Sequence, residues 1–260
     1  MQLNSVPILN YHKITAKKDI GITSRHPRDF EKDLRLLHHF GYTSITFEQY
    51  FNESVLPSKP VILTFDDGYA SVLTDALPIM QKFGFRGVIF MPVNYIGKTN
   101  DWDVQFGKKV FRHLDREEIR ILSEAGFELG SHGLTHQPLP AMSAGRIKKE
   151  LAESKHILET ITGKSVFSIC YPFGRFNIPV LRAARESGYR AGVASMYWKA
   201  LSNGYSSLAL RRFNVYRFDS QHTLREKLCL PWNSLLAYRD RMIQFGSSAT
   251  ILYQRLKKPH

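Results

Sequence analysis

The sequence predicts an α/β fold in which parallel strands close into a barrel. Amphipathic helices alternate with short apolar strands, which is the pattern of βαβ units. Three of these strands run directly into polar or glycine-proline segments: VILTF into DDG, FELG into SHGLTH, and VFSIC into YPFG. Because the carboxyl ends of all strands lie on one face of a βα barrel, we expect these segments to meet there and to form a site.

The boundaries between helices and strands follow one recurring arrangement. A helix ends in glycine, an aromatic residue follows, and an apolar strand begins, at Gly41, Gly84, Gly126 and Gly188. Glycine is favoured just beyond a helix C-terminus because the backbone there turns left-handed. The arrangement therefore predicts four helix ends, each followed by a strand.

The helices are predicted from apolar spacing and from caps. In chain order, Pro78 restarts a helix after a short loop, since proline fits a first helical turn. Asp115 and Glu118 have the spacing of a capping box, and Gly163 marks the end of a long helix. The apolar face of the first helix is formed by Leu34, Leu37 and Phe40. The face of the long helix is formed by Ile147, Leu151, Ser154, Leu158 and Ile161.

We predict one domain over residues 1–260, since the chain has no linker or low-complexity segment. From about residue 221 the strand pattern stops, and KLCLPWNSLLAYRDRMIQF is typical of helix interrupted at Pro231. Residues 211–260 hold ten Lys or Arg against three Asp or Glu. Residues 221–260 are therefore expected to form a basic, mainly helical C-terminal extension. A cap on one end of the barrel is the simpler interpretation, and a membrane-surface or partner-binding helix is the alternative.

The charge balance points to an anionic partner. The chain has 36 Lys or Arg against 23 Asp or Glu, a net charge of +13. An acidic glycan, a lipid phosphate, a membrane surface or nucleic acid would each fit. We expect no specific nucleic-acid binding, because the sequence has no helix-turn-helix, zinc-finger or RNA-binding signature. Nothing in the sequence indicates an oligomeric state.

The sequence shows no membrane span and no export signal. No apolar run approaches the length of about 18 residues that a transmembrane helix needs. The start, MQLNSVPILNYHKI, lacks a basic segment followed by a long apolar core. These features favour a cytoplasmic location or peripheral association with the inner membrane face. Two cysteines, Cys170 and Cys229, form neither a disulfide framework nor a thiolate metal cluster, which is compatible with a reducing compartment.

Two of the converging segments contain metal-binding side chains. In SHGLTH, His132 and His136 are four residues apart, and in a helical turn this spacing places both imidazoles on one face. A carboxylate from Asp66 or Asp67 completes a set of two histidines and one carboxylate. That set suits a catalytic zinc and also iron, cobalt or nickel. Taken separately, DDG is also compatible with an Asp-capped turn, and the histidine pair more often indicates surface or capping histidines.

The aspartate pair predicts a division of roles. Successive side chains at a strand end point in different directions, so one carboxylate can bind a metal while the other acts as a general base. A bound cation would offset the repulsion between the two carboxylates, and Gly68 lets the backbone turn at once. YPFG, residues 171–174, predicts a tight turn whose backbone N–H groups can face an oxyanion, or a turn alone.

Together these residues resemble the polysaccharide deacetylase superfamily, also called the nodulation-deacetylase homology family or family-four carbohydrate esterases. TFDDG resembles the first motif of that family, SHGLTH the second, and CYPFG a variant of the third. PILNYHKI, FMPVNYIGK and LRRFNV resemble the branch of biofilm poly-N-acetylglucosamine deacetylases. The resemblance covers most of the chain before residue 221. It implies a distorted (β/α) barrel, expected to have seven strands, and metal-dependent removal of an N-acyl group.

The resemblance also implies roles for individual residues. Asp66 would be the general base, and Asp67, His132 and His136 would hold the metal. The Phe173 backbone N–H would help to stabilise the oxyanion.

Three further residues are candidates for binding the substrate. Tyr171 and Pro172 belong to the third motif, and Trp102, in NDWD, follows a strand end. Trp102 can stack on a sugar face or pack within its loop.

The sequence departs from the family pattern in two places. Cys170 stands where many members have an arginine that orients the base, and the late Leu-x-His motif, whose histidine protonates the leaving amine, is not evident. Because LALRRFNV lies near that position, we expect Arg211 or Arg212 to replace the missing arginine. His12, in NYHK, is the first candidate for the general acid, and His222 is the second.

The leading hypothesis is a metal-dependent hydrolase that removes an N-acyl group, most often acetyl, from an amino sugar in a polysaccharide, oligosaccharide or glycolipid. Zinc is the first candidate for its divalent metal. A deacylase of a non-sugar linear amide is an alternative on the same fold. A glycan-binding homologue with impaired catalysis is the non-enzyme alternative. The aspartate pair argues against an iron oxygenase.

Overall fold

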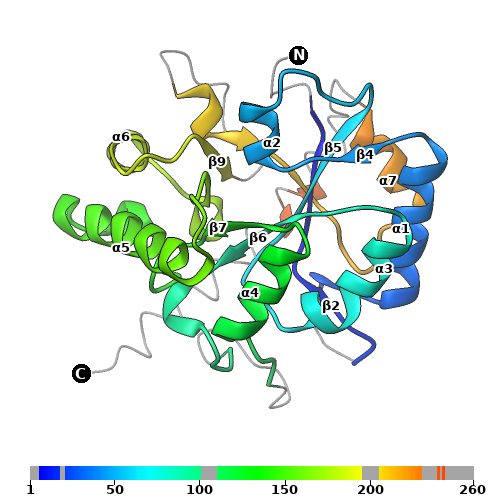
Figure 1. Cartoon of the computed structure of the whole chain (residues 1–260), viewed down its shortest axis with the longest axis horizontal. Helices are drawn as coiled ribbons and strands as arrows, with labels where there is room; N and C mark the ends of the chain where they lie inside the picture. The colour runs from blue at the N-terminus through cyan, green and yellow to red at the C-terminus, as the bar shows by residue number, and fades with distance from the viewer. Residues whose placement is uncertain are drawn as a thin grey trace.

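The computed structural model describes residues 6–17, 21–100, 110–194, 205–229, 239–240 and 242–243. Its main sheet consists of short parallel strands at the centre of the molecule (Figure 1). In chain order these are β1 (Ile8–Tyr11), β4 (Thr43–Ser44), β5 (Pro60–Phe65), β6 (Val88–Met91), β7 (Glu128–Ser131), β8 (Ser168–Cys170), β9 (Ala191–Ala194), β10 (Leu210–Arg211) and β11 (Phe213–Asn214). A separate pair is formed by β2 (Lys13–Ile14) and β3 (Ser24–Arg25).

The main sheet curves into an almost closed barrel. Its strand order is β10-β9-β8-β7-β6-β5-β1-β11, with β4 paired to β5 beside this path. The two end strands are separated in the chain only by Arg212, and they pair with β9 and with β1 respectively. The segment 210–214 therefore closes the barrel. The predicted distorted (β/α) barrel is confirmed. The strand order contains eight strands rather than the expected seven, because the closing segment is divided into two strands at Arg212.

Seven helices of the described part of the chain surround the strands, as Figure 1 shows. They are α1 (Pro27–His39), α2 (Phe47–Asn52), α3 (Leu77–Lys82), α4 (Arg116–Glu124), α5 (Ala144–Thr162), α6 (Ile178–Glu186) and α7 (Gln221–Leu228). Among the described residues, no helix is both long and apolar enough to cross a membrane.

Most of the predicted helix ends are confirmed. Asp115 and Glu118 form a reciprocal capping box at the start of α4, and Gly163 ends α5 in a left-handed conformation. The glycines of the recurring arrangement all have positive φ: 73° at Gly41, 68° at Gly84, 89° at Gly126 and 82° at Gly188. Each allows the sharp turn from a helix into the following strand.

Two details of the helix prediction were wrong. Phe40 is the C-cap of α1 rather than part of its buried face, and it is 36% exposed. Pro78 does lie in the first turn of α3, but a π-helical turn over Val72–Ala76 leads directly into that helix in place of a loop.

The strands place alternate side chains inside and outside the barrel, as the two-residue repeat of a strand requires. One buried cluster contains Ile8, Ile62, Val88, Val193 and Leu210 and fills the barrel interior. The residues next to these in the chain, such as Leu9, Leu63 and Ile89, belong to the larger cluster beneath the helices. The interior positions further along the strands are polar, and they form the site described below.

The start of the predicted C-terminal extension packs on the barrel. Helix α7 lies against α1, next to it in Figure 1, and Leu224 and Leu228 are buried. Lys227 is fully buried and pairs with Asp219. This part of the extension therefore packs against the rest of the domain, and a cap over one end of the barrel stays a prediction. Of residues 230–260 the structure describes 239–240 and 242–243, which are helical, and Pro231 lies outside the described residues.

Candidate active site

Side chains from four strand ends meet at the C-terminal end of the barrel. Asp66 follows β5, His132 follows β7, Cys170 ends β8, and Arg212 lies between β10 and β11. All four are buried, with exposures of 4%, 2%, 0% and 6%. The expectation that the separate motifs meet on one face agrees with this arrangement.

Asp67, His132 and His136 form a compact group, named here the dihistidine set. Asp67 Oδ1 lies 3.5 Å from His132 Nε2 and 3.3 Å from His136 Nε2. Tetrahedral zinc with ligand distances of about 2.0–2.1 Å places neighbouring ligand atoms about 3.4 Å apart. The group therefore fits a divalent metal. Burial would raise the pKa of Asp67, but its contacts with the imidazoles of His132 and His136 hold it well below its usual value.

The tautomer of His132 follows from its backbone contact. His132 Nδ1 lies 2.7 Å from the carbonyl oxygen of Cys170. Because a carbonyl can only accept, Nδ1 carries the proton and donates it. The lone pair is then on Nε2, which faces Asp67. A hydrogen bond of this kind commonly orients a metal-binding histidine.

The loop carrying the two histidines is not helical, although their four-residue spacing would also place both imidazoles on one face of a helical turn. The loop instead has positive φ values at Gly133 (75°) and His136 (51°). Buried Glu150 of α5 holds it, since its carboxylate accepts from Leu134 N at 2.9 Å, Thr135 N at 3.1 Å and Thr135 Oγ1 at 2.7 Å. The His132 and His136 rings nevertheless lie 4.7 Å apart, because this loop turns as sharply as a helix would.

The backbone at Asp67 is also left-handed, with φ of 66°. Its carbonyl accepts from Nδ1 of the buried His113 at 2.7 Å, and His113 stacks on Tyr69 with a centroid distance of 4.9 Å. Gly68 follows with φ of 57°, and a Cβ there would lie 2.1 Å from Met91 Sδ. Glycine at this position is therefore required by both conformation and space.

Asp66 is held by an arginine, and the structure distinguishes between the two candidates. Arg212 donates through Nη1 to Asp66 Oδ1 at 2.6 Å and through Nη2 to Oδ2, a bidentate pair. Arg211 is exposed. Burial alone would raise the pKa of Asp66, but the charge of Arg212 keeps it below its usual value. Asp66 is thus ionised in the folded protein.

Three further side chains support this pair. Asn10 Nδ2 donates to Asp66 Oδ2 at 3.2 Å, while Asn10 Oδ1 accepts from Arg212 Nη1 at 2.9 Å and from Thr64 Oγ1 at 3.0 Å. Arg212 Nη2 also lies 2.9 Å from Cys170 Sγ. The guanidinium therefore reaches Asp66 past the cysteine that stands in the family's arginine position.

His12 lies at the mouth of the site. Its Nε2 is 3.9 Å from Asp66 Oδ2, and its side chain is 19% exposed. Burial lowers the pKa of His12, although the nearby carboxylates oppose the shift. The second candidate, His222, is on α7; its side chain is 81% exposed and lies 3.6 Å from Glu226.

The third motif forms a tight turn beside the histidines. Phe173 has a left-handed backbone, with φ of 59°, and its ring lies 5.0 Å from that of His136. Tyr171 is fully buried and donates its hydroxyl to the Leu208 carbonyl, and Pro172 is buried too. The Tyr171 side chain is therefore used in packing, so any contact with substrate there involves the backbone. Trp102 lies outside the described residues.

The sequence interpretation missed four supporting residues: Asn10, Thr64, His113 and Glu150. Thr64 and Asp66 share the interior face of β5, so the two-residue repeat was a signal for Thr64. Asn10 lies opposite Thr64 in the register of β1 with β5. Its role could therefore be predicted only by knowing how these two strands pair. His113 and Glu150 act on backbone groups, and no sequence pattern marks such contacts.

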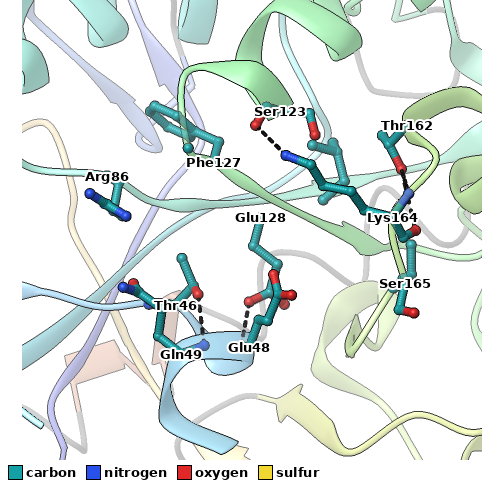
Figure 2. A pocket seen from close by; sticks show the side chains of 13 residues that line it. Thr46, Glu48, Gln49, Arg86, Ser123, Phe127, Glu128, Thr162, Lys164 and Ser165 are labelled. Carbon is teal, nitrogen blue, oxygen red and sulfur yellow. Dashed lines mark hydrogen bonds between the residues drawn. The ribbon is translucent and has the colours of Figure 1, made fainter. Parts of the chain in front are cut away.

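A second concave feature lies at the other end of the barrel, where strands begin (Figure 2). Its cavity of about 160 Å³ is lined by residues that include Glu48, Arg86, Glu128 and Lys164. Glu128 lies at the centre of this view and accepts from Glu48 N at 2.9 Å and from Ser168 Oγ at 2.5 Å. Burial raises the pKa of Glu128 to about 7.

A parallel barrel with a carboxylate–histidine cluster at its C-terminal face is an arrangement typical of hydrolases. Residues 53–192 match the family model for polysaccharide deacetylase. The Bacillus subtilis (strain 168) protein YxkH, whose name assigns it to the polysaccharide deacetylases, is 31% identical over 81% of this chain and 71% of its own length. The chain therefore belongs to the polysaccharide deacetylase family, which confirms the predicted family and identifies the protein as a deacetylase.

Further relatives agree with this assignment. The poly-β-1,6-N-acetyl-D-glucosamine N-deacetylase of Staphylococcus epidermidis is 24% identical over 73% of this chain and 72% of its own length. A polysaccharide deacetylase structure from Bacillus anthracis superposes with a TM-score of 0.73 at 26% identity, over 86% of this chain and 69% of that one. The Streptococcus pyogenes deacetylase PplD in complex with acetate shares the fold, with a TM-score of 0.74, 23% identity, and coverage of 86% and 98%.

Proposed function

We propose that the protein removes an N-acyl group, most often acetyl, from an amino sugar in a polysaccharide, oligosaccharide or glycolipid. The observation that carries this proposal is the position of Asp66, an ionised carboxylate held by Arg212 directly beside the dihistidine set. Relatives named as N-deacetylases of poly-β-1,6-N-acetyl-D-glucosamine support an N-acetylated amino sugar as the substrate class.

Asp67, His132 and His136 would hold a divalent metal, with Zn²⁺ first and Co²⁺, Ni²⁺ or Fe²⁺ as alternatives. A metal bound there supplies polarisation of the amide carbonyl and lowers the pKa of a water molecule. Asp67 and the two imidazoles offer one ligand atom each, so positions remain open for water and substrate.

Asp66 acts as the general base and accepts a proton from the attacking water. Arg212 holds both carboxylate oxygens, and Asn10 contacts Oδ2 from the neighbouring strand. The base therefore keeps one orientation with respect to the water. Fixing a catalytic group in this way reduces the reorganisation needed at the moment of reaction.

The remaining steps use His12 and Phe173. Water oxygen bonds to the acyl carbon, and the Phe173 N–H donates to the oxyanion that develops. The C–N bond then breaks, and His12 protonates the leaving amine, giving a carboxylic acid and a free amino sugar. His12 lies within 3.9 Å of Asp66, so the proton that Asp66 accepts has a short path to it.

The net charge of +13 favours an anionic glycan or glycolipid and is compatible with peripheral association with a membrane.

The test is release of amine and acetate from N-acetylhexosamine oligomers, with and without added zinc or cobalt. Asp66→Asn should lower kcat by about 10²–10⁴-fold while metal still binds, because Asp66 is outside the dihistidine set. Asp29→Asn, on the surface of α1 beside Lys32, is the matched control and should retain full activity. Turnover of small amides alone would identify a non-sugar deacylase. The proposal would be contradicted if the protein bound no metal and turned over no glycan or amide.

A further inference from the structure

The site contains a second group of side chains that could hold a cation. Asp66, His132 and Cys170 are all buried, and their ligand atoms lie within 4.8 Å of one another. We name them the cysteine set. Cys170 Sγ is 3.7 Å from Asp66 Oδ2 and 3.9 Å from His132 Nε2.

The cysteine set and the dihistidine set compete for one atom. Both include His132, whose Nδ1 proton is donated to the Cys170 carbonyl. Only Nε2 can therefore bind a cation, and it can serve one set at a time. Thiolate is a strong ligand for zinc and for softer ions such as cadmium, so ligand chemistry alone does not favour the dihistidine set.

Arg212 lies among the side chains of the cysteine set. Its guanidinium donates to both oxygens of Asp66, and its Nη2 is 2.9 Å from Cys170 Sγ. Hydrogen bonds to Asn10 Oδ1 (2.9 Å) and Thr64 Oγ1 (3.3 Å) fix Nη1. A guanidinium is always charged in proteins. A fixed positive charge thus lies against two of the three ligand atoms, Asp66 Oδ2 and Cys170 Sγ.

We propose that Arg212 excludes metal cations from the cysteine set and so directs them to the dihistidine set. It thereby keeps Asp66 from becoming a metal ligand. The inference rests on the metal site of the proposed function, but it concerns which atoms bind the metal and can be tested without a substrate. A cation that did bind to the cysteine set would displace the guanidinium and the thiol proton.

The experiment is a cadmium titration of the full chain, followed by the charge-transfer absorption of cadmium–thiolate bonds and by cadmium-113 NMR. A Cys229→Ser background removes the exposed second thiol, leaving Cys170 as the only cysteine. With Arg212 present, cadmium should bind without a thiolate band. Arg212→Met should produce a band equivalent to one thiolate, and Arg212→Met combined with Cys170→Ser should lose it.

A thiolate band in the protein that retains Arg212 would overturn the proposal. So would a folded Arg212→Met variant that binds cadmium with the same spectrum as its parent. If Arg212→Met does not fold, the protein that retains Arg212 still tests the proposal at excess cadmium. A cadmium–thiolate band there would show that Arg212 does not exclude the cation from the cysteine set. Cadmium bound without a band in a protein inactive on every substrate would uphold the inference while the proposed function fails. Deacetylase activity together with a thiolate band would uphold the proposed function and overturn the inference about Arg212.

Discussion

At the scale of the residue, the environment of Asp66 explains how a buried carboxylate can stay ionised. Burial favours the neutral acid, but Arg212 supplies a charge, and Asn10 and Thr64 complete the hydrogen bonds of the guanidinium. A buried pair of charges is tolerated only when its remaining donors and acceptors are satisfied. Here side chains from three strand segments satisfy them, so the Asp66 carboxylate is held rigidly as well as charged.

His12 provides a test at the same scale. His12→Ala should lower kcat for N-acetylated oligosaccharides by about 10²–10⁴-fold, because in the proposed mechanism the imidazole beside Asp66 supplies the proton for the leaving amine. Metal affinity should not change, since His12 is not part of the dihistidine set. The measurement is steady-state turnover together with metal titration.

His222→Ala is the matched control, because His222 is largely exposed on α7. Its turnover should equal that of the parent protein. Unchanged turnover in His12→Ala would remove His12 from the mechanism.

At the scale of the element, helix α5 supports the loop between His132 and His136 from outside the barrel. Glu150 accepts three hydrogen bonds from Leu134 and Thr135, and these bonds shape the loop between His132 and His136. The histidines are therefore positioned by a helix that begins eight residues after His136. Mutation of residues that position metal ligands commonly lowers metal affinity or activity by about 10–100-fold.

Glu150→Gln should destabilise the fold by about 1–3 kcal/mol. The NH₂ group of the new amide would face an N–H or O–H donor of Leu134 or Thr135, which would then lose its acceptor. Metal affinity should fall by about 10–100-fold. Urea denaturation and metal titration measure the two effects. Glu153→Gln, on the exposed side of the same helix beside Lys149, should change stability by less than about 0.5 kcal/mol. Equal behaviour of the two variants would contradict the role given to Glu150.

The elements also show what a sequence can predict. Strands that end in DDG, SHGLTH and YPFG were enough to predict a barrel with Asp66, Asp67, His132 and His136 at one end, since parallel strands impose that convergence. The choice between Arg211 and Arg212 was beyond the sequence, because it depends on the register of a two-residue strand with β9. The shape of the SHGLTH loop was also beyond the sequence, because it depends on hydrogen bonds to Glu150 of the following helix.

At the scale of the whole molecule, the two ends of the barrel hold carboxylates whose pKa values are shifted in opposite directions. Arg212 keeps the pKa of Asp66 low, whereas Glu128 at the other end is buried and has a pKa of about 7. The value for an exposed glutamate is 4.5. The fold thus binds a proton at Glu128 more tightly than the unfolded chain does.

This difference predicts a pH dependence of stability. The contribution of Glu128 is greatest below pH 4.5 and is lost as the pH rises to about 7, for a total of about 3 kcal/mol. Glu128→Gln cannot ionise and should lack this fall. Urea unfolding of both proteins between pH 4.5 and 8 measures it, with the exposed Glu124→Gln as control. Parallel stability curves for the parent and Glu128→Gln would contradict the prediction.

The closing segment 210–214 has a consequence for the order of folding. Asp66 and its counter-ion are separated by 146 residues, and Arg212 belongs to the last segment to enter the barrel in chain order. A chain emerging from the ribosome thus holds every ligand of the dihistidine set long before it holds the partner of Asp66. Under the proposed mechanism the chain therefore becomes competent only when the ring is complete, because the same segment closes the barrel and holds Asp66.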